Sequence, residues 1–128
     1  MSAARKISEA ESILARLQNS PEKLEFENFI KTIHDVFSHL LDEYNVKFAL
    51  KINKIGLEKF KTTAKKAGKI DAINFLIWYE KEYKKLRNDP EIGQYLEREY
   101  QMPENVITVC TRLLDEVRKI AYYAYENF

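Results

Sequence analysis

The sequence predicts an all-α protein, most simply an antiparallel bundle of five to six helices in one domain spanning residues 1–128. A chain of 128 residues is long enough to bury a core of its own. Three glycines and three prolines leave little material for the many tight turns of an all-β fold. No stretch alternates apolar and polar residues for long enough to form a strand, whereas apolar residues recur at helical spacing along most of the chain.

The first two predicted helices span residues 7–18 and 21–44. In the first, four apolar residues recur at helical spacing. Ser20 and Pro21 predict the start of the second helix, as its N-cap and its first helical residue. Along that helix the large apolar residues fall within about 80° either side of one line, which predicts a long helix with one buried face.

Two more helices are predicted in the middle of the chain. The third spans residues 46–67, although its apolar face drifts after Gly56, and Gly68 is expected to end it as a C-cap. The fourth spans residues 70–87 and contains INFLIWYEKEY (residues 73–83), which begins apolar on nearly every side. A helix of this kind is usually buried on two sides, so we expect it to lie between neighbours.

The C-terminal part predicts a short helix and a long one. Asp89 and Pro90 begin the short helix, which ends near residue 100, and Pro103 precedes a helix over residues 104–126. Cys110, the only cysteine, lies on the apolar stripe of this last helix. A single cysteine excludes an internal disulfide, and its position predicts a small buried hydrophobe rather than a nucleophile.

Phe75 and Trp78 are the predicted partner-binding residues. On a helical wheel centred on Leu76 they point away from the main apolar face, and Trp is favoured in interface hot spots. A second copy of the chain, giving a homodimer, is the expected partner. The alternatives are packing between helices of the same chain or a small apolar ligand held around Trp78. Glu80 falls near the apolar face and is expected to form a buried ion pair with Arg87 or with a basic group of another helix.

A basic segment lies between two acidic ones. Residues 47–69 carry eight lysines and one glutamate, and the flanking segments each sum to −3. On a continuous third helix, five lysines would share an arc of about 80°. With two arginines, these are the candidates for binding a polyanion, either a nucleic acid or an acidic protein. They are Lys47, Lys51, Lys54, Lys61, Lys65, Arg87 and Arg98. The alternative is a solvated lysine-rich face.

No arrangement of residues predicts catalysis, a metal or a cofactor. His34 and His39 lie about 140° apart on one helix and cannot share a metal. Asp35, His39 and Glu43 do line up, but on the side opposite the apolar stripe, where a solvated charged face is expected. The three glycines are isolated, so there is no phosphate-binding loop.

The composition also predicts where the protein works. No apolar run approaches the length of a membrane span, and the N-terminus lacks the apolar region of a signal peptide. We therefore expect a cytoplasmic protein with no membrane association. Abundant Lys and Glu with little Gln are compatible with a heat-adapted source.

Two stretches, FENFIKTIHDVFSHLLDEY and WYEKEYKKLRNDPEIGQYLEREY, together resemble the HEPN superfamily of small helical bundles. In ribonuclease-active members an arginine and a following histidine assemble at a dimer interface. By this resemblance Arg98, with Glu99 after it, takes the place of the arginine. No histidine follows His39 in this chain, so the resemblance implies a non-catalytic member that serves as a dimeric binding or accessory module, sometimes in toxin–antitoxin or defence systems.

The expected function is therefore that of a non-catalytic helical interaction module, self-associating and accessory or regulatory in its role. The alternative is an RNA-binding or RNA-cleaving HEPN-like protein that uses the basic surface.

Overall fold

The fold is all-α, as predicted. The computed structural model describes residues 2–89 and 102–128, and no strand occurs in these ranges. The helices are α1 (Ala3–Asn19), α2 (Lys23–Lys47), α3 (Leu57–Ala67), α4 (Ile70–Arg87) and α5 (Val106–Asn127). The short helix predicted after Asp89, with Arg98 on it, lies outside the described residues. In the same ranges, no helix has the length and apolar character needed to cross a membrane.

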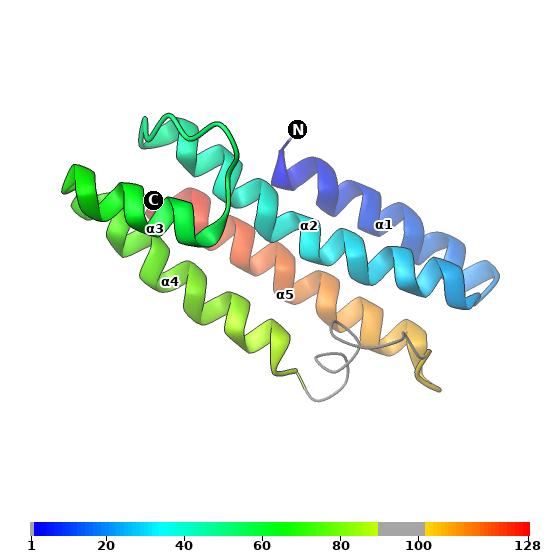
Figure 1. The fold of residues 1–128 in the computed structure, drawn as a ribbon. Coiled ribbons are helices and arrows are strands. Elements are labelled where there is room, and N and C mark those ends of the chain that lie inside the picture. The colour runs from blue at the N-terminus through cyan, green and yellow to red at the C-terminus, as the bar shows by residue number, and fades with distance from the viewer. Residues whose placement is uncertain (1, 90–101) are drawn as a thin grey trace.

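The four long helices form an antiparallel bundle. Figure 1 shows α1, α2, α4 and α5 side by side, each running opposite to the one before it, with the short α3 beside the first half of α4. The loop from α2 to α3 lies at the same end of the bundle as the C-terminus of α5. Consequently α3, the start of α4 and the end of α5 lie close together.

The side chains that α1 and α5 bury are small or aliphatic, whereas α2 also buries Phe26 and Phe29. Ala3 and Ala10 of α1 are completely buried, as are Leu113 and Ala124 of α5. Alanine at a contact lets two helix backbones approach closely, since only a methyl group separates them. The buried contact between α1 and α5 is therefore made by small and aliphatic side chains.

Aromatic rings fill the part of the core formed by α4 with α2 and α3. Phe75 of α4 is completely buried and stacks on Tyr44 of α2, with 4.3 Å between ring centroids. Its ring also lies 5.7 Å from that of Phe60, which is itself fully buried on α3. Tyr79 packs edge-on against Phe37. Large rings thus separate α4 from its neighbours and bridge the space between them.

The start of α2 differs from the prediction by two residues. Ser20 ends α1 instead of starting α2: its backbone N–H donates to the carbonyl of Arg16 at 2.8 Å. Glu22 takes the N-cap position of α2, and its carboxylate accepts a hydrogen bond from the Ser20 hydroxyl. Ser20 lies between two helices, so its sequence position fits the C-cap of α1 as well as the N-cap of α2.

The continuous helix predicted over residues 46–67 is wrong. The α2 helix ends at Lys47, and a loop follows in which Ala49 and Lys51 adopt the left-handed conformation, with φ of 53° and 58°. The side chain of Asn45 fixes this loop by hydrogen bonds to both the N–H and the carbonyl of Ile52, at 3.1 and 3.0 Å. The predicted C-cap is confirmed, since Gly68 ends α3 with φ of 63°.

Candidate functional site

The neighbours of α4 cover most of its apolar residues. Phe75 has no exposed surface, because rings from α2 and α3 and from the end of α5 surround it. The partner contact predicted for Phe75 is therefore wrong: a ring that its own chain encloses cannot contact another molecule. Phe75 does point in a different direction from Leu76, as the helical wheel predicts, but Phe60 of α3 packs against it on that side.

Trp78 lies at the seam between α4 and α5. It is half-buried and stacks on Tyr123, with 5.2 Å between ring centroids and 22° between ring planes. The ring centroid of Phe128 lies 5.4 Å from that of Trp78 and 5.5 Å from that of Phe75. Tyr123 keeps 47% of its surface exposed. The outer surface of these three rings therefore forms an aromatic patch that remains open to solvent.

Two isoleucines on the outer side of α4 extend this patch. Ile70 is 70% exposed and Ile77 is 66% exposed. Seven residues apart, they lie within about 20° of one line along the helix. Exposed apolar side chains are ordinary when scattered, whereas a contiguous group marks an interaction site. We call Ile70, Ile77, Trp78, Tyr123 and Phe128 the α4/α5 face.

Sequence reasoning found Trp78 but missed both isoleucines. The available signal was their seven-residue spacing, about 100–120° around α4 from Leu76, with Lys81 within about 40° of the same line. Charged or polar residues normally occupy such a line on a surface helix. In a segment that is apolar on nearly every side, this signal is hard to separate from a second buried face.

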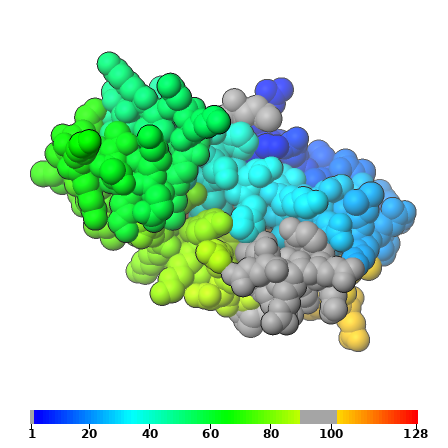
Figure 2. Space-filling model, in the orientation of Figure 1, coloured from blue at the N-terminus to red at the C-terminus, as the bar shows by residue number. Residues whose placement is uncertain are grey.

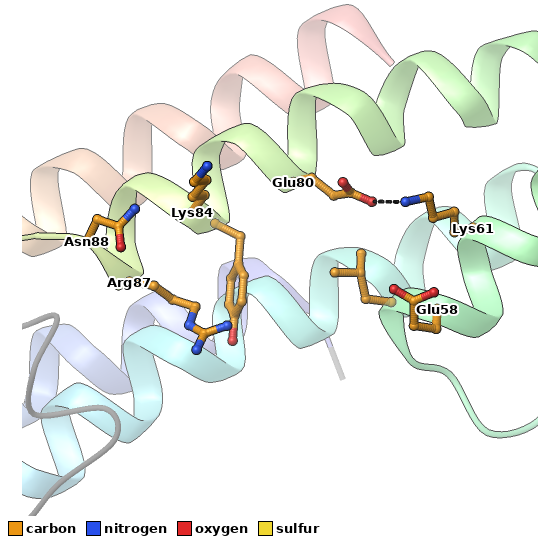
Figure 3. Close-up of a pocket in the computed structure, with 8 residues that line it drawn as sticks. Glu58, Lys61, Glu80, Lys84, Arg87 and Asn88 are labelled. Atoms are coloured by element: carbon orange, nitrogen blue, oxygen red, sulfur yellow. Dashed lines mark ion pairs between the residues drawn. The ribbon is translucent and has the colours of Figure 1, made fainter.

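A polar groove of about 420 Å³ lies between α3 and α4. Figure 3 shows Glu58 and Lys61 reaching into it from α3, and Glu80, Lys84, Arg87 and Asn88 lying along α4. The carboxylate of Glu80 pairs with Lys61 across the groove at 3.7 Å. Of the two partners considered for Glu80, the structure places a basic group of another helix beside it. The pair is about one-third exposed rather than buried.

Arg87 lies at the other end of the groove (Figure 3), close to the half-buried His34. His34 of α2 packs edge-on against Tyr83, whose hydroxyl lies 3.4 Å from Nδ1. Burial lowers the pKa of His34, the nearby positive charge of Arg87 lowers it further, and Asp35 opposes both. The neutral imidazole contacts the Tyr83 phenol and is a packed boundary residue, because none of the described residues that line the groove is a serine, threonine or cysteine.

The lysines gather at one end of the molecule without forming a helical stripe. Lys47 ends α2, Lys51 and Lys54 lie in the loop, and only Lys61 and Lys65 belong to α3. Figure 2 shows the segment they belong to, residues 47–69, as one end of the molecule, which we call the basic end. The predicted arc of five lysines is wrong because the loop interrupts the helix.

Not every lysine of the basic end is available to a ligand. The amine of Lys69 donates to the carbonyls of Phe48 and Ala49 and so ties the loop to the start of α4. Lys61 is paired with Glu80. The six others are exposed: Lys47, Lys51, Lys54, Lys59, Lys65 and Lys66.

Asp35 and Glu43 connect α2 to α1 and α5, whereas His39 pairs within α2, so the three side chains have separate partners. Glu43 accepts hydrogen bonds from the backbone N–H of Ala3 at 2.7 Å and from the Tyr125 hydroxyl at 2.8 Å. Asp35 lies 3.7 Å from Lys6, and His39 lies 3.6 Å from Asp42. Within residues 2–89 and 102–128, no group of three potential ligands could hold a metal ion. The solvated face expected here is thus partly covered by α1.

Cys110 lies inside the aliphatic core. It has no exposed surface, and burial raises the pKa of its thiol to about 12. Since the thiolate is the reactive form of cysteine, this thiol is protonated and inaccessible at neutral pH.

Comparison with protein-family models, with curated proteins and with solved structures finds no match to this chain. What the fold defines is a class: an antiparallel all-α bundle with a solvent-open aromatic face at one seam and a lysine-rich end.

Proposed function

We propose that the protein is a non-catalytic helical interaction module that self-associates through the α4/α5 face. The observation that carries this proposal is the exposure of Ile70 and Ile77 beside the open rings of Trp78 and Tyr123. Complete burial of an isoleucine side chain is worth about 1.5–3 kcal/mol. A symmetric dimer would bury both isoleucines from each copy, so this term favours association.

The size of the face sets the expected affinity. The 18 residues of α4 span roughly 27 Å, and two adjacent helices are roughly 20 Å wide, which gives a face of roughly 500 Å² in projection. Stable interfaces bury about 800 Å² of each partner. We therefore expect a reversible dimer with a dissociation constant near the micromolar range.

Light scattering after size exclusion tests the proposal. We expect the molar mass of the wild-type chain to rise from 15.2 kDa toward twice that value as its concentration increases. Ile77→Asp should keep the protein monomeric, because it places a charge within the apolar contact. Val46→Asp is the matched control: Val46 is 77% exposed but lies at the end of α2, outside the face. A wild-type mass that stays at one chain across the series contradicts the proposal.

The basic end supports a second candidate function, the binding of a nucleic acid through its phosphates. Eight lysines and one glutamate lie within 23 residues of chain, and six of the lysines are exposed. Lysine is a point charge that binds phosphate without reading base edges, so binding of this kind is independent of sequence and sensitive to salt.

A labelled RNA duplex titrated at increasing salt tests this second function. We expect a linear loss of log affinity with log salt concentration, and a smaller slope in the Lys65→Glu/Lys66→Glu variant. Arg5→Glu, at an exposed position of α1, should leave the slope unchanged. Binding that no salt concentration weakens would contradict phosphate recognition. Cleavage of the RNA that Arg98→Ala abolishes would contradict the non-catalytic proposal and favour the HEPN-like ribonuclease.

A further inference from the structure

The charges around the α4/α5 face are arranged in two opposite groups. Because α4 and α5 are antiparallel and Trp78 stacks on Tyr123, residues before Trp78 lie level with residues after Tyr123. Asp71 and Glu126 therefore lie at one end of the face, and Lys81 and Lys119 lie at the other. All four side chains are exposed.

These four groups differ from the charges next to them along the seam. In the part of the chain that the structure describes, no ion pair involves any of them, whereas the charges next along the seam are paired. Lys85 pairs with Glu82, and Arg112 pairs with both Asp89 and Glu116. The α4/α5 face thus carries an acidic pair, Asp71 and Glu126, and a lysine pair, Lys81 and Lys119, about 15 Å apart along α4.

We infer that two copies of the chain pair through the α4/α5 face about a two-fold axis that runs across the helices, so that α4 lies antiparallel on α4 and α5 on α5. The inference rests on the proposed self-association and specifies its geometry. A two-fold interface brings the same patch of both copies together, and its axis lies within the interface.

Charge selects this axis over the other simple choice. An axis parallel to the helices would bring Lys81 and Lys119 of one copy onto the same two lysines of the other, which is unfavourable. An axis across the helices places Lys81 opposite Asp71 of the second copy and Lys119 opposite Glu126, and each contact occurs twice.

The positions of the residues along the two helices agree with a single axis. Asp71 and Lys81 are symmetric about position 76 of α4, and Lys119 and Glu126 are symmetric about the Tyr122–Tyr123 bond of α5. The stack of Trp78 on Tyr123 places these two midpoints at nearly the same level. Ile77 then lies within about one residue of the axis, against its own counterpart, where association excludes water best.

Charge reversal measured by sedimentation equilibrium tests the axis. We expect Lys119→Glu to weaken dimerisation roughly five- to tenfold, because two attractive contacts become repulsive. Lys119→Glu/Glu126→Lys should restore most of the loss, since the reversed pair attracts again. Lys81→Glu should weaken the dimer similarly. Lys66→Glu, on α3, is the control for a change in net charge, and thermal unfolding checks that every variant is folded.

The outcomes separate the axis from the self-association. If Lys119→Glu strengthens the dimer, like charges meet in the wild type and the axis is parallel to the helices. If the single reversals change nothing, or the double reversal fails to restore the dimer, the axis is wrong while self-association stands. If the wild-type chain stays monomeric at every concentration, the proposed function itself fails.

Discussion

The two halves of the bundle achieve burial in different ways. Where α1, α2 and α5 meet, alanines and leucines are enclosed completely, although Tyr122 and Tyr125 of α5 stay exposed beside α1. Around α4 the contacts are made by rings, several of which carry a polar group at one edge. Tyr79 donates its buried hydroxyl to the carbonyl of Phe37 at 2.9 Å, and Tyr83 directs its hydroxyl at His34.

This difference explains where the chain remains open. In an amphipathic helix the aliphatic side chains form one stripe, which packs against the stripe of a neighbouring helix. Rings extend further and bridge α4 to α2, α3 and α5, but no element of the described chain covers the outer line of Ile70 and Ile77. The aromatic half therefore leaves a line of apolar side chains on α4 that the described chain does not cover, and the proposed function follows from it.

The largest expected effect comes from removing the ring at the centre of the aromatic half. Phe75→Ala should lower the free energy of unfolding by about 3–5 kcal/mol, because Phe75 is fully enclosed and contacts rings from four different segments. Urea unfolding of Phe75→Ala and of Leu113→Ala, its fully buried counterpart in the aliphatic half, compares the two regions. A loss below 1 kcal/mol for Phe75→Ala would contradict the described packing.

Glu43 tests how the aliphatic half is held at its end. Glu43→Ala removes the acceptor of the Ala3 N–H and of the Tyr125 hydroxyl, and we expect a loss of about 1–2 kcal/mol in the free energy of unfolding. Asp42→Ala, at the neighbouring half-exposed position, is the control. Amide hydrogen exchange should show faster opening at the start of α1 in the Glu43 variant alone. Equal exchange in both variants would argue against this contact.

A smaller effect is expected from the buried hydroxyl of the aromatic half. Tyr79→Phe keeps the ring and removes only the hydrogen bond to the carbonyl of Phe37, so the free energy of unfolding should fall by about 1 kcal/mol. Tyr122→Phe, whose side chain is 68% exposed, should change nothing measurable. The same loss in both variants would show that the buried hydroxyl contributes no specific stability.

The smallest effect concerns pH. Burial lowers the pKa of His34 in the folded chain below the ordinary 6.5, which the unfolded chain retains. The neutral imidazole therefore contributes its full stability above about pH 6.5, and this contribution is lost as the pH falls through the folded-state pKa. Urea midpoints measured from pH 7.5 down to pH 5 should fall more steeply for the wild-type chain than for His34→Gln. Identical slopes would mean that His34 titrates normally in the fold.

The sequence predicted the long helices better than the segment that joins α2 to α3. The positions of α1, α2 and α5 follow from apolar periodicity. The bounds of α4 were predicted because Gly68 and the sequence Asp89-Pro90 interrupt the helical pattern on either side of it. The break after Lys47 was missed, since Phe48, Ile52 and Ile55 are spaced as on a helix but pack onto the core from a loop. The side chains of Asn45 and Lys69 fix that loop by hydrogen bonds to its backbone, and side-chain contacts of this kind have no periodic signal.

The site was predictable in part for a related reason. Periodicity showed that Trp78 points away from Leu76, but whether a neighbour covers that side depends on tertiary packing. Helix α3 encloses Phe75, whereas only Tyr123 and Phe128 flank Trp78. The lysine arc failed because it depended on the helix that the loop interrupts. The concentration of charge in residues 47–69 did not depend on helical phase and survives in the fold.

Fluorescence of the single tryptophan, recorded across a concentration series, tests the central claim most directly. Trp78 is half-buried in one chain and lies on the α4/α5 face, so association should shield it further. We expect the emission to shift to shorter wavelength and acrylamide quenching to weaken as the protein concentration rises, with neither change in Ile77→Asp. Emission and quenching that stay constant from the lowest to the highest concentration would contradict self-association through this face.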